Sequence, residues 1–284
     1  MKAARILGAL TLAALALILS GCATSTAPGA VGVQRSQLLI VPAGQVTQLA
    51  ETAFRDQNTE ATKKGTLVRS GPELERLQRI ADRLIAQAPI FRNDTASWNW
   101  EVVLIDEPVI NATCYPGGKI TFYTGIVRQL KLTDGEIAAV MGHEICHALR
   151  EHGREKMSQT MLQQGLAALA VAVTDEKHHA KIAGANLFAT VAVALPYSRE
   201  MELEADKMGM ELMARAGFDP RDAVTMQEKL ARASEDGAKF ELLSTHPVGE
   251  RRVRDLAALV PTVMPFYEAS RADGTPAERT TLQR

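Results

Sequence analysis

The stretch Met141-Gly142-His143-Glu144-Ile145-Cys146-His147 decides the fold prediction for this chain of 284 residues. Histidines four residues apart lie on one face of a helix, so His143 and His147 can present two imidazoles to a single metal ion. Glu144 lies about 100° around the helix from His143, beside such a metal without being its ligand. From there its carboxylate can take a proton from a water that attacks a peptide carbonyl. Short motifs also arise by chance on buried helices, where both histidines would be ordinary core residues.

The residues around this motif predict a helix. Thr133 precedes Glu136 by three residues, which is the spacing of a capping box at a helix N-terminus. Apolar residues then recur at helical spacing, namely Ile137, Ala138, Val140, Met141, Ile145, Ala148 and Leu149. We therefore expect a helix over about residues 134–152.

A catalytic zinc ion needs a third protein ligand and a fourth position open to water. Glu202 and Asp206 are four residues apart in a segment rich in helix formers, so they share one helix face. Glu200 and Glu204 are also four apart, on a face turned about 160° from the first pair. Spacing alone does not choose between the two pairs, and all four acids could equally form a solvated surface.

Four motifs in this order resemble the HtpX/Ste24/Oma1 family of zinc metallopeptidases. They are HExxH at His143–His147, ExxAD at Glu202–Asp206, an NAxxxPGG segment beginning at Asn111, and an HPxxxxR element from His246 to Arg252. The chain is closest in character to bacterial periplasmic lipoprotein members of that family. The resemblance implies an α+β fold, a mainly helical zincin-like metallopeptidase domain with one small β-sheet beside the HExxH helix.

The resemblance also implies a role for each site residue. One Zn²⁺ per chain is held by His143, His147 and Glu202, with Glu144 as general base, while Asp206 orients a ligating histidine. His246 is expected near the metal, where it could fill the open coordination position or donate a hydrogen bond to the oxyanion. It could also merely cap a helix. Arg252 is expected to pair with one of the acids or to face the cleft.

The implied activity is that of a zinc-dependent endopeptidase, which hydrolyses peptide bonds of misfolded or misassembled envelope proteins with a zinc-activated water. An alternative is a chaperone-like quality-control lipoprotein that binds such proteins and rarely cuts them. The intact Glu144 argues against this alternative, because a protein that only binds has no need of a general base. The formal net charge of −1 and the lack of a basic stripe with interleaved aromatic residues predict no nucleic-acid binding.

The segment from Asn111 to Cys114, with Ala112 and Thr113 between them, is expected to bind substrate. A protease can hold an extended peptide by adding it as a strand to a sheet edge, although this segment could also be an interior strand. Cys114 and Cys146 should lie close together, and we expect two separate thiols because a disulfide between helix and strand has strict geometric demands. Cys114 as a fourth zinc ligand is a further alternative.

The N-terminus resembles a bacterial lipoprotein signal peptide over residues 1–21. A basic start precedes an apolar run of about 14 residues, too short for a membrane span, and Leu19-Ser20-Gly21-Cys22 matches a lipobox. Cys22 is then the expected site of lipidation, and Ala23 after it favours the outer membrane. We expect a periplasmic enzyme on a lipid anchor, with residues 22–35 as the linker.

Residues 36–260 are expected to form the peptidase domain and residues 261–284 a tail. Apolar periodicity predicts helices and strands along the domain. The helices are expected at 46–54, 72–88, 134–152, 154–173, 183–194, 199–216, 220–235 and 248–259, and the strands at 98–105, 110–115 and 119–124, with a short strand or arm at 36–41. Two apolar segments between Leu162 and Leu195 predict a helical hairpin over the site, and His178-His179 between them are expected to be exposed loop residues.

Overall fold

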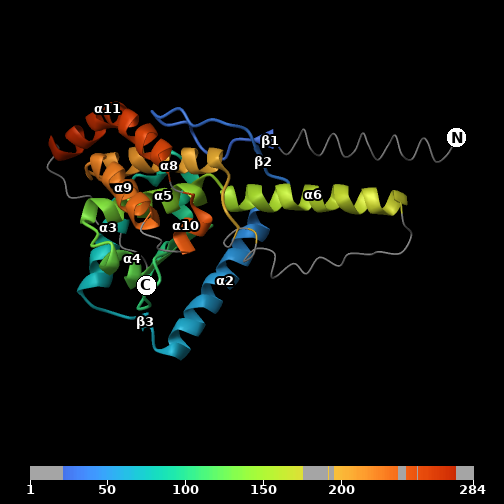
Figure 1. Cartoon of the computed structure of the whole chain (residues 1–284), viewed down its shortest axis with the longest axis horizontal. Helices are drawn as coiled ribbons and strands as arrows, with labels where there is room; N and C mark the ends of the chain where they lie inside the picture. Colours follow the sequence, from blue (N-terminus) through green and yellow to red (C-terminus); the bar gives the residue numbers. More distant parts are fainter. Residues whose placement is uncertain (1–21, 175–190, 192–194, 236–240, 248, 273–284) are drawn as a thin grey trace.

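The computed structural model describes residues 22–174, 191, 195–235, 241–247 and 249–272. Helices dominate, and one four-stranded sheet lies among them (Figure 1). The predicted α+β fold, with a small sheet beside the HExxH helix, is therefore confirmed.

The elements agree with the predicted ones in order, and several short ones are new. The helices are α2 (Ala43–Lys64), α3 (Pro72–Ile85), α4 (Thr124–Gln129), α5 (Asp134–Leu149), α6 (His152–Thr174), α8 (Arg199–Arg215), α9 (Arg221–Glu235), α10 (Glu241–Thr245) and α11 (Glu250–Ala272), with 3₁₀ turns η1 (Ala88–Ile90) and η2 (Asn93–Ser97). The strands are β1 (Cys22–Ala23), β2 (Gln37–Leu38), β3 (Leu67–Val68), β4 (Glu101–Ile105), β5 (Ala112–Tyr115) and β6 (Lys119–Tyr123).

The main sheet has the strand order β3-β4-β6-β5. β4 and β6 are parallel, while the outer strands β3 and β5 pair antiparallel with their neighbours. Val102 and Leu104 pack into the core that includes α3 and α5, whereas Val103 and Ile105 pack against α2 on the other face. Strand β4 is buried on both faces, which explains why it is a continuous apolar run rather than an alternating one.

Helices α5 and α8 cross at a pair of glycines. A Cβ atom on Gly209 would lie 2.9 Å from the backbone nitrogen of His143, and one on Gly142 would lie 3.1 Å from the backbone oxygen of Gly209. Only residues without a side chain permit so close an approach of two helix backbones. This crossing brings the ExxAD segment of α8 against the HExxH segment of α5.

Both ends of α5 have clear local causes. At its N-terminus, Glu136 N donates to the Thr133 hydroxyl and Thr133 N donates to the Glu136 carboxylate, which is the predicted capping box. The helix ends at Leu149 instead of continuing to residue 152, and Glu151 has a φ of 52°. This left-handed residue turns the chain, so α6 begins at His152 in a new direction.

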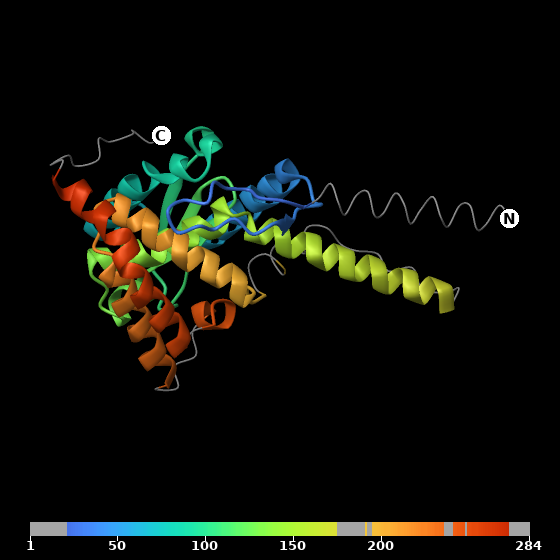
Figure 2. The same ribbon diagram turned by 90° about the horizontal axis from the view of Figure 1, so that it is seen from above.

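The segment from Cys22 to Val41, which we call the N-terminal arm, lies against the body (Figures 1 and 2, blue). β1 and β2 pair with each other, Val33 and Gln37 are buried, and Arg35 forms ion pairs with Glu155 and Glu204. This packing corrects the prediction of a linker over residues 22–35. The Thr, Ser, Pro and Gly content of residues 22–35 is typical of linkers. Composition does not reveal that Arg35 pairs with Glu155 of α6 and Glu204 of α8.

Helix α11 continues to Ala272, so the predicted tail begins too early. Pro261 and Pro265 lie inside the helix, where each lacks a backbone N–H to donate. Packing compensates, because Val263 is fully buried and the guanidinium of Arg215 lies 3.7 Å from the centroid of the Phe266 ring. Residues 273–284 lie outside the described chain.

Some predictions fall outside the described residues. They are the signal peptide over 1–21, the helix over 183–194, most of the hairpin between Leu162 and Leu195, and His178-His179. Within the described part, no helix has both the length and the apolar run that crossing a bilayer requires. Cys114 and Cys146 are both free thiols, as predicted.

Candidate metal centre

Four potential ligand atoms converge where α5, α8 and the end of α10 meet. His143, His147, Glu202 and His246 each offer one atom, and within the described chain these atoms all lie within 4.8 Å of one another. The Nε2 atom of His147 is 3.0 Å from Nε2 of His143 and 3.3 Å from Oε1 of Glu202. Three of the four residues are the predicted metal ligands.

The chemistry of this cluster fits a divalent metal ion. Oε2 of Glu202 and Oε1 of Glu144 are buried in the described structure without an aligned hydrogen bond. Oε2 of Glu202 also lies 2.8 Å from Nη1 of Arg252, whereas the imidazole nitrogens and a carboxylate oxygen converge as a donor set that suits a divalent cation. Two histidines and one glutamate are typical ligands of catalytic zinc.

Glu144 lies beside the cluster without being part of it. It is buried, and its Oε1 atom is 3.5 Å from Nε2 of His246. Burial raises the pKa of Glu144 above its ordinary value, which makes its carboxylate a better proton acceptor. The position matches the predicted general base.

Asp206 and Arg252 support the cluster from one side. Arg252 donates from Nε and Nη2 to the two carboxylate oxygens of Asp206 at 2.8 and 2.6 Å, and its Nη1 lies 2.8 Å from Oε2 of Glu202. Oδ1 of Asp206 is 3.0 Å from Nδ1 of His143, a close contact although not a well-aligned hydrogen bond. Burial alone would raise the pKa of Asp206, but Arg252 and His143 lower it. The carboxylate therefore stays ionised next to the imidazole.

The two acidic pairs of α8, which spacing did not separate, have different surroundings. Glu202 and Asp206 face α5, whereas Glu200 is exposed. Glu204 is buried on another side of α8, where Arg35, Arg150 and His152 bind its carboxylate. The resemblance had indicated the pair that faces the cluster.

His152 was missed by the sequence analysis and touches a predicted ligand. Its Nδ1 atom is 2.9 Å from Nδ1 of His147, and its Nε2 atom is 3.0 Å from Oε2 of Glu204. The available signal was a third histidine five residues after His147. A continuous helix would have placed it about 140° away from that ligand. Only the turn at Glu151 brings it back.

Tyr197, just before α8, is a second residue that was missed. Its ring lies over the ring of His147, with 4.0 Å between centroids and 31° between planes. The ammonium of Lys156 lies 4.0 Å from the Tyr197 centroid, and burial lowers the pKa of Lys156 to about 8. These two residues cover the side of His147 that faces α6.

A cleft separates β5 from the cluster. Thr113 and Cys114 of β5 and the preceding Asn111 line it on one side, and Glu144 and His147 of α5 line it on the other. Among the described strands, β5 is an outer strand of its sheet, and the cleft adjoins it. The substrate-binding role predicted for this segment, including that of Ala112, belongs to the proposal below.

The backbone N–H and C=O of Cys114 are directed away from the neighbouring strand β6. Tyr123 N donates to Asn111 O, so the alternating antiparallel pattern directs the N–H and C=O of Thr113 and Tyr115 toward β6. The same groups of Ala112 and Cys114 then point toward the cleft. The N–H of Ala112 is already bound by the side-chain oxygen of Asn111 at 2.9 Å.

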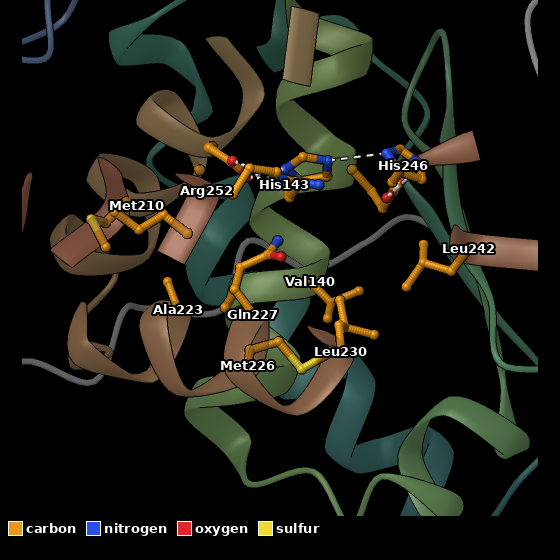
Figure 3. A pocket seen from close by; sticks show the side chains of 15 residues that line it. Val140, His143, Met210, Ala223, Met226, Gln227, Leu230, Leu242, His246 and Arg252 are labelled. Carbon is orange, nitrogen blue, oxygen red and sulfur yellow. Dashed lines mark hydrogen bonds and ion pairs between the residues drawn. The ribbon is translucent and has the colours of Figure 1, made fainter. Parts of the chain in front are cut away.

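A second cavity, of about 40 Å³, adjoins His143 and Glu144 on the side of α9 (Figure 3). Its wall is mainly apolar and includes Val140, Met226, Leu230 and Leu242. Gln227 points from α9 toward His143, and its Oε1 atom is buried without a hydrogen-bond partner in the described structure. Such a volume holds a few water molecules.

Comparison with known proteins decides the family. Residues 72–260, about two thirds of the chain, match the model of peptidase family M48. The chain belongs to peptidase family M48. The match includes His143, Glu144, His147, Glu202 and His246. The predicted resemblance is thereby confirmed, and so is the prediction of a metallopeptidase.

Several relatives carry names of proteases. The chain is 39% identical over 159 residues to a mitochondrial metalloendopeptidase OMA1 of Arabidopsis thaliana, covering 56% of this chain and 31% of that protein. It is 30% identical over 224 residues to the protein of that name from Schizosaccharomyces pombe, covering 78% and 63%. It is 29% identical over 209 residues to a beta-barrel assembly-enhancing protease of Yersinia pestis, covering 69% and 41%. The chain thus spans less than two thirds of each of these relatives.

Proposed function

We propose that this member of family M48 is a zinc-dependent endopeptidase. The observation that carries the proposal is the convergence of His143, His147 and Glu202, with Glu144 buried beside them. Two histidines and one glutamate leave a coordination position open, whereas structural zinc sites are usually closed by four cysteines or histidines. When bound, Zn²⁺ would acidify water and polarise the carbonyl of the scissile bond.

Each residue of the chain then has a defined task. Glu144 accepts the proton of the attacking water and later donates a proton to the leaving amine. Asp206, held by Arg252, lies 3.0 Å from Nδ1 of His143, so its negative charge favours the tautomer with the proton on Nδ1 and the lone pair on Nε2. His246 Nδ1 lies 2.8 Å from Glu202 Oε1 and 3.2 Å from His143 Nε2, so His246 is close enough to the ligand cluster to compete with water for a bound metal ion.

The substrate is an extended polypeptide that adds as a strand to β5. The open edge supports this, because the backbone groups of Cys114 point into a cleft that Glu144 and His147 also line. A binding mode through main-chain hydrogen bonds needs unfolded segments rather than a specific sequence. It therefore fits misfolded or misassembled envelope proteins, and the Yersinia pestis relative, named a beta-barrel assembly-enhancing protease, supports a role in protein assembly.

We further propose that the enzyme is anchored by lipidation at Cys22 and works in the periplasm, at the outer membrane. The lipobox Leu19-Ser20-Gly21-Cys22 and the short apolar run before it support this location. Acyl chains at Cys22 would hold the body close to the bilayer, because the N-terminal arm is packed rather than extended.

Casein cleavage by wild type and by Glu144→Gln, each with and without a chelator, tests the function. We expect wild type alone to cleave, the chelator to abolish cleavage, and added Zn²⁺ to restore it. Glu144→Gln should bind Zn²⁺ as wild type does and cleave nothing. If both proteins bind Zn²⁺ and unfolded casein without cleaving it, the chaperone-like alternative is correct.

A further inference from the structure

We propose that His152 and Glu204 are positioning residues for the metal ligand His147, and that the N-terminal arm is part of the assembly that holds them. This inference rests on the proposed function, because it concerns how one ligand of the metal is oriented. It assigns a task to a buried group of charges that the proposed reaction does not use.

The orientation follows from a chain of hydrogen bonds with a single direction. A carboxylate only accepts, so the His152 Nε2 atom, 3.0 Å from Glu204 Oε2, carries the proton and donates it. The Nδ1 atom of neutral His152 is then an acceptor, and His147 Nδ1, at 2.9 Å, must donate to it. This leaves the lone pair of His147 on Nε2, the atom that faces His143 and Glu202. One carboxylate thus selects the tautomer of two histidines.

The carboxylate itself is held by two arginines. Arg150, which has no exposed surface, donates from Nη2 to both oxygens of Glu204 at 3.2 Å. Arg35 donates to the same oxygens at 3.0 Å from Nε and Nη2. Both oxygens of Glu204 thus accept from arginine N–H groups, and Oε2 also accepts from His152 Nε2, so Glu204 is the terminal acceptor of the chain.

Both arginines are fixed by the N-terminal arm. Arg35 belongs to the arm and also binds Glu155 of α6 through Nη1 and Nη2, at 2.6 and 2.9 Å. Arg150 donates to the Thr24 hydroxyl at 3.0 Å and to the backbone oxygen of Arg35 at 2.9 Å. Gln37 closes the group by donating to the backbone oxygen of Arg150. Three successive side chains, Arg35, Glu204 and His152, thus connect the N-terminal arm to the metal ligand His147.

The matched variants His152→Leu and His152→Asn test the first part. Leucine removes the atom that accepts from His147 Nδ1. Asparagine restores an acceptor, because its side-chain oxygen lies at about the place of Nδ1 of His152. Zn²⁺ affinity is measured on metal-stripped proteins by competition with a chromophoric chelator. The ligand-field spectrum of the Co²⁺ forms and the melting temperature of the metal-free forms are recorded in parallel.

We expect His152→Leu to weaken Zn²⁺ binding about 10- to 100-fold and to shift the Co²⁺ bands, because partners of metal ligands contribute that much. His152→Asn should retain most of the affinity, while the two metal-free variants melt at similar temperatures. Equal affinity of His152→Leu and wild type, or equal losses in both variants, would overturn the inference. Casein cleavage by wild type would still stand in that case, so the proposed function is tested separately.

The arm is tested with Arg35→Met, and Arg128→Met is its control. Arg128 forms ion pairs with Glu73 and Asp106 on the surface, and within the described chain no hydrogen bond or ion pair joins it to the arm or the cluster. Arg35→Met should weaken Zn²⁺ binding several-fold and Arg128→Met should not. Unchanged affinity in Arg35→Met would remove the arm from the assembly. If His152→Leu does not fold, Arg35→Met carries the test, because it leaves both histidines in place.

Discussion

Glu202 and Glu204 stand two residues apart on α8, and both are buried carboxylates with histidine neighbours. Glu202 faces the Nε2 atoms of two imidazoles, and its Oε2 atom lies 2.8 Å from Nη1 of Arg252. Both oxygens of Glu204 are bound, by two arginines and one histidine. A carboxylate that faces two imidazole Nε2 atoms is suited to share a metal ion with them, whereas a carboxylate bound by two arginines and a histidine is suited to hold those groups in place. Glu202 and Glu204 are both buried glutamates, so the residues that surround each of them determine its role.

Exchanging the two carboxylates for amides gives the largest expected difference. Glu202→Gln should lose stoichiometric Zn²⁺ and all casein cleavage, because a neutral amide is a poor zinc ligand. Glu204→Gln should retain the metal with an affinity lower by on the order of 10-fold. Metal analysis after dialysis and initial rates of casein cleavage measure both effects. Equal losses in the two variants would mean that both acids serve only the fold.

The close crossing of α5 and α8 is what brings Glu202, but not Glu204, to the cluster. Gly209→Ala places a Cβ atom 2.9 Å from the His143 nitrogen, so the helices must shift. Overpacking of this kind costs about 1–3 kcal/mol, and we expect Zn²⁺ affinity to fall on the order of 10-fold as the ligands separate. Gly249→Ala is the control, since its Cβ atom meets nothing within 4 Å. A chelator competition assay compares the two, and equal affinities would show that the crossing does not set the ligand distances.

Variants of β5 test substrate binding in the cleft without changing the proposed metal ligands. Cys114→Pro removes the N–H that points into the cleft, while Cys114→Val keeps it. One lost backbone hydrogen bond is about 1 kcal/mol, so KM for a peptide substrate should rise about 5-fold in the proline variant only. Steady-state kinetics with Zn²⁺ content determined in parallel measures the effect. Identical KM values would contradict strand addition.

His246 should give the smallest change, and in the opposite direction. His246 offers one of the four converging ligand atoms, so it would compete with water for the position that the other three residues leave open. His246→Ala should therefore raise the turnover of casein several-fold without loss of Zn²⁺. A fall in turnover would instead assign His246 to stabilisation of the oxyanion.

The sequence predicted the fold class, the order of the elements and the convergence of His143, His147 and Glu202. These depend on helical spacing, a capping box and a recognisable motif order, all of which are local signals or a resemblance. His152 and the arm could not be predicted in this way. Their contacts arise from a left-handed turn at Glu151 and from ion pairs between residues more than 100 positions apart, such as Arg35 and Glu155.

The predictions were wrong near both ends of the domain for a related reason. Composition indicated a linker over residues 22–35 and a tail from residue 261, because both stretches contain prolines and polar residues. Packing overrides composition in both places. Thr26 is buried where its hydroxyl accepts from Arg150, and Val263 is buried within α11.

Anomalous diffraction at the zinc absorption edge, from crystals of the wild-type protein, measures the metal site most directly. We expect one strong peak per chain, in contact with Nε2 of His143, Nε2 of His147 and a carboxylate oxygen of Glu202, and none at Glu204. The absence of a peak among these three residues in zinc-soaked crystals, or a peak bound to Glu204 instead, would contradict the proposed metal centre.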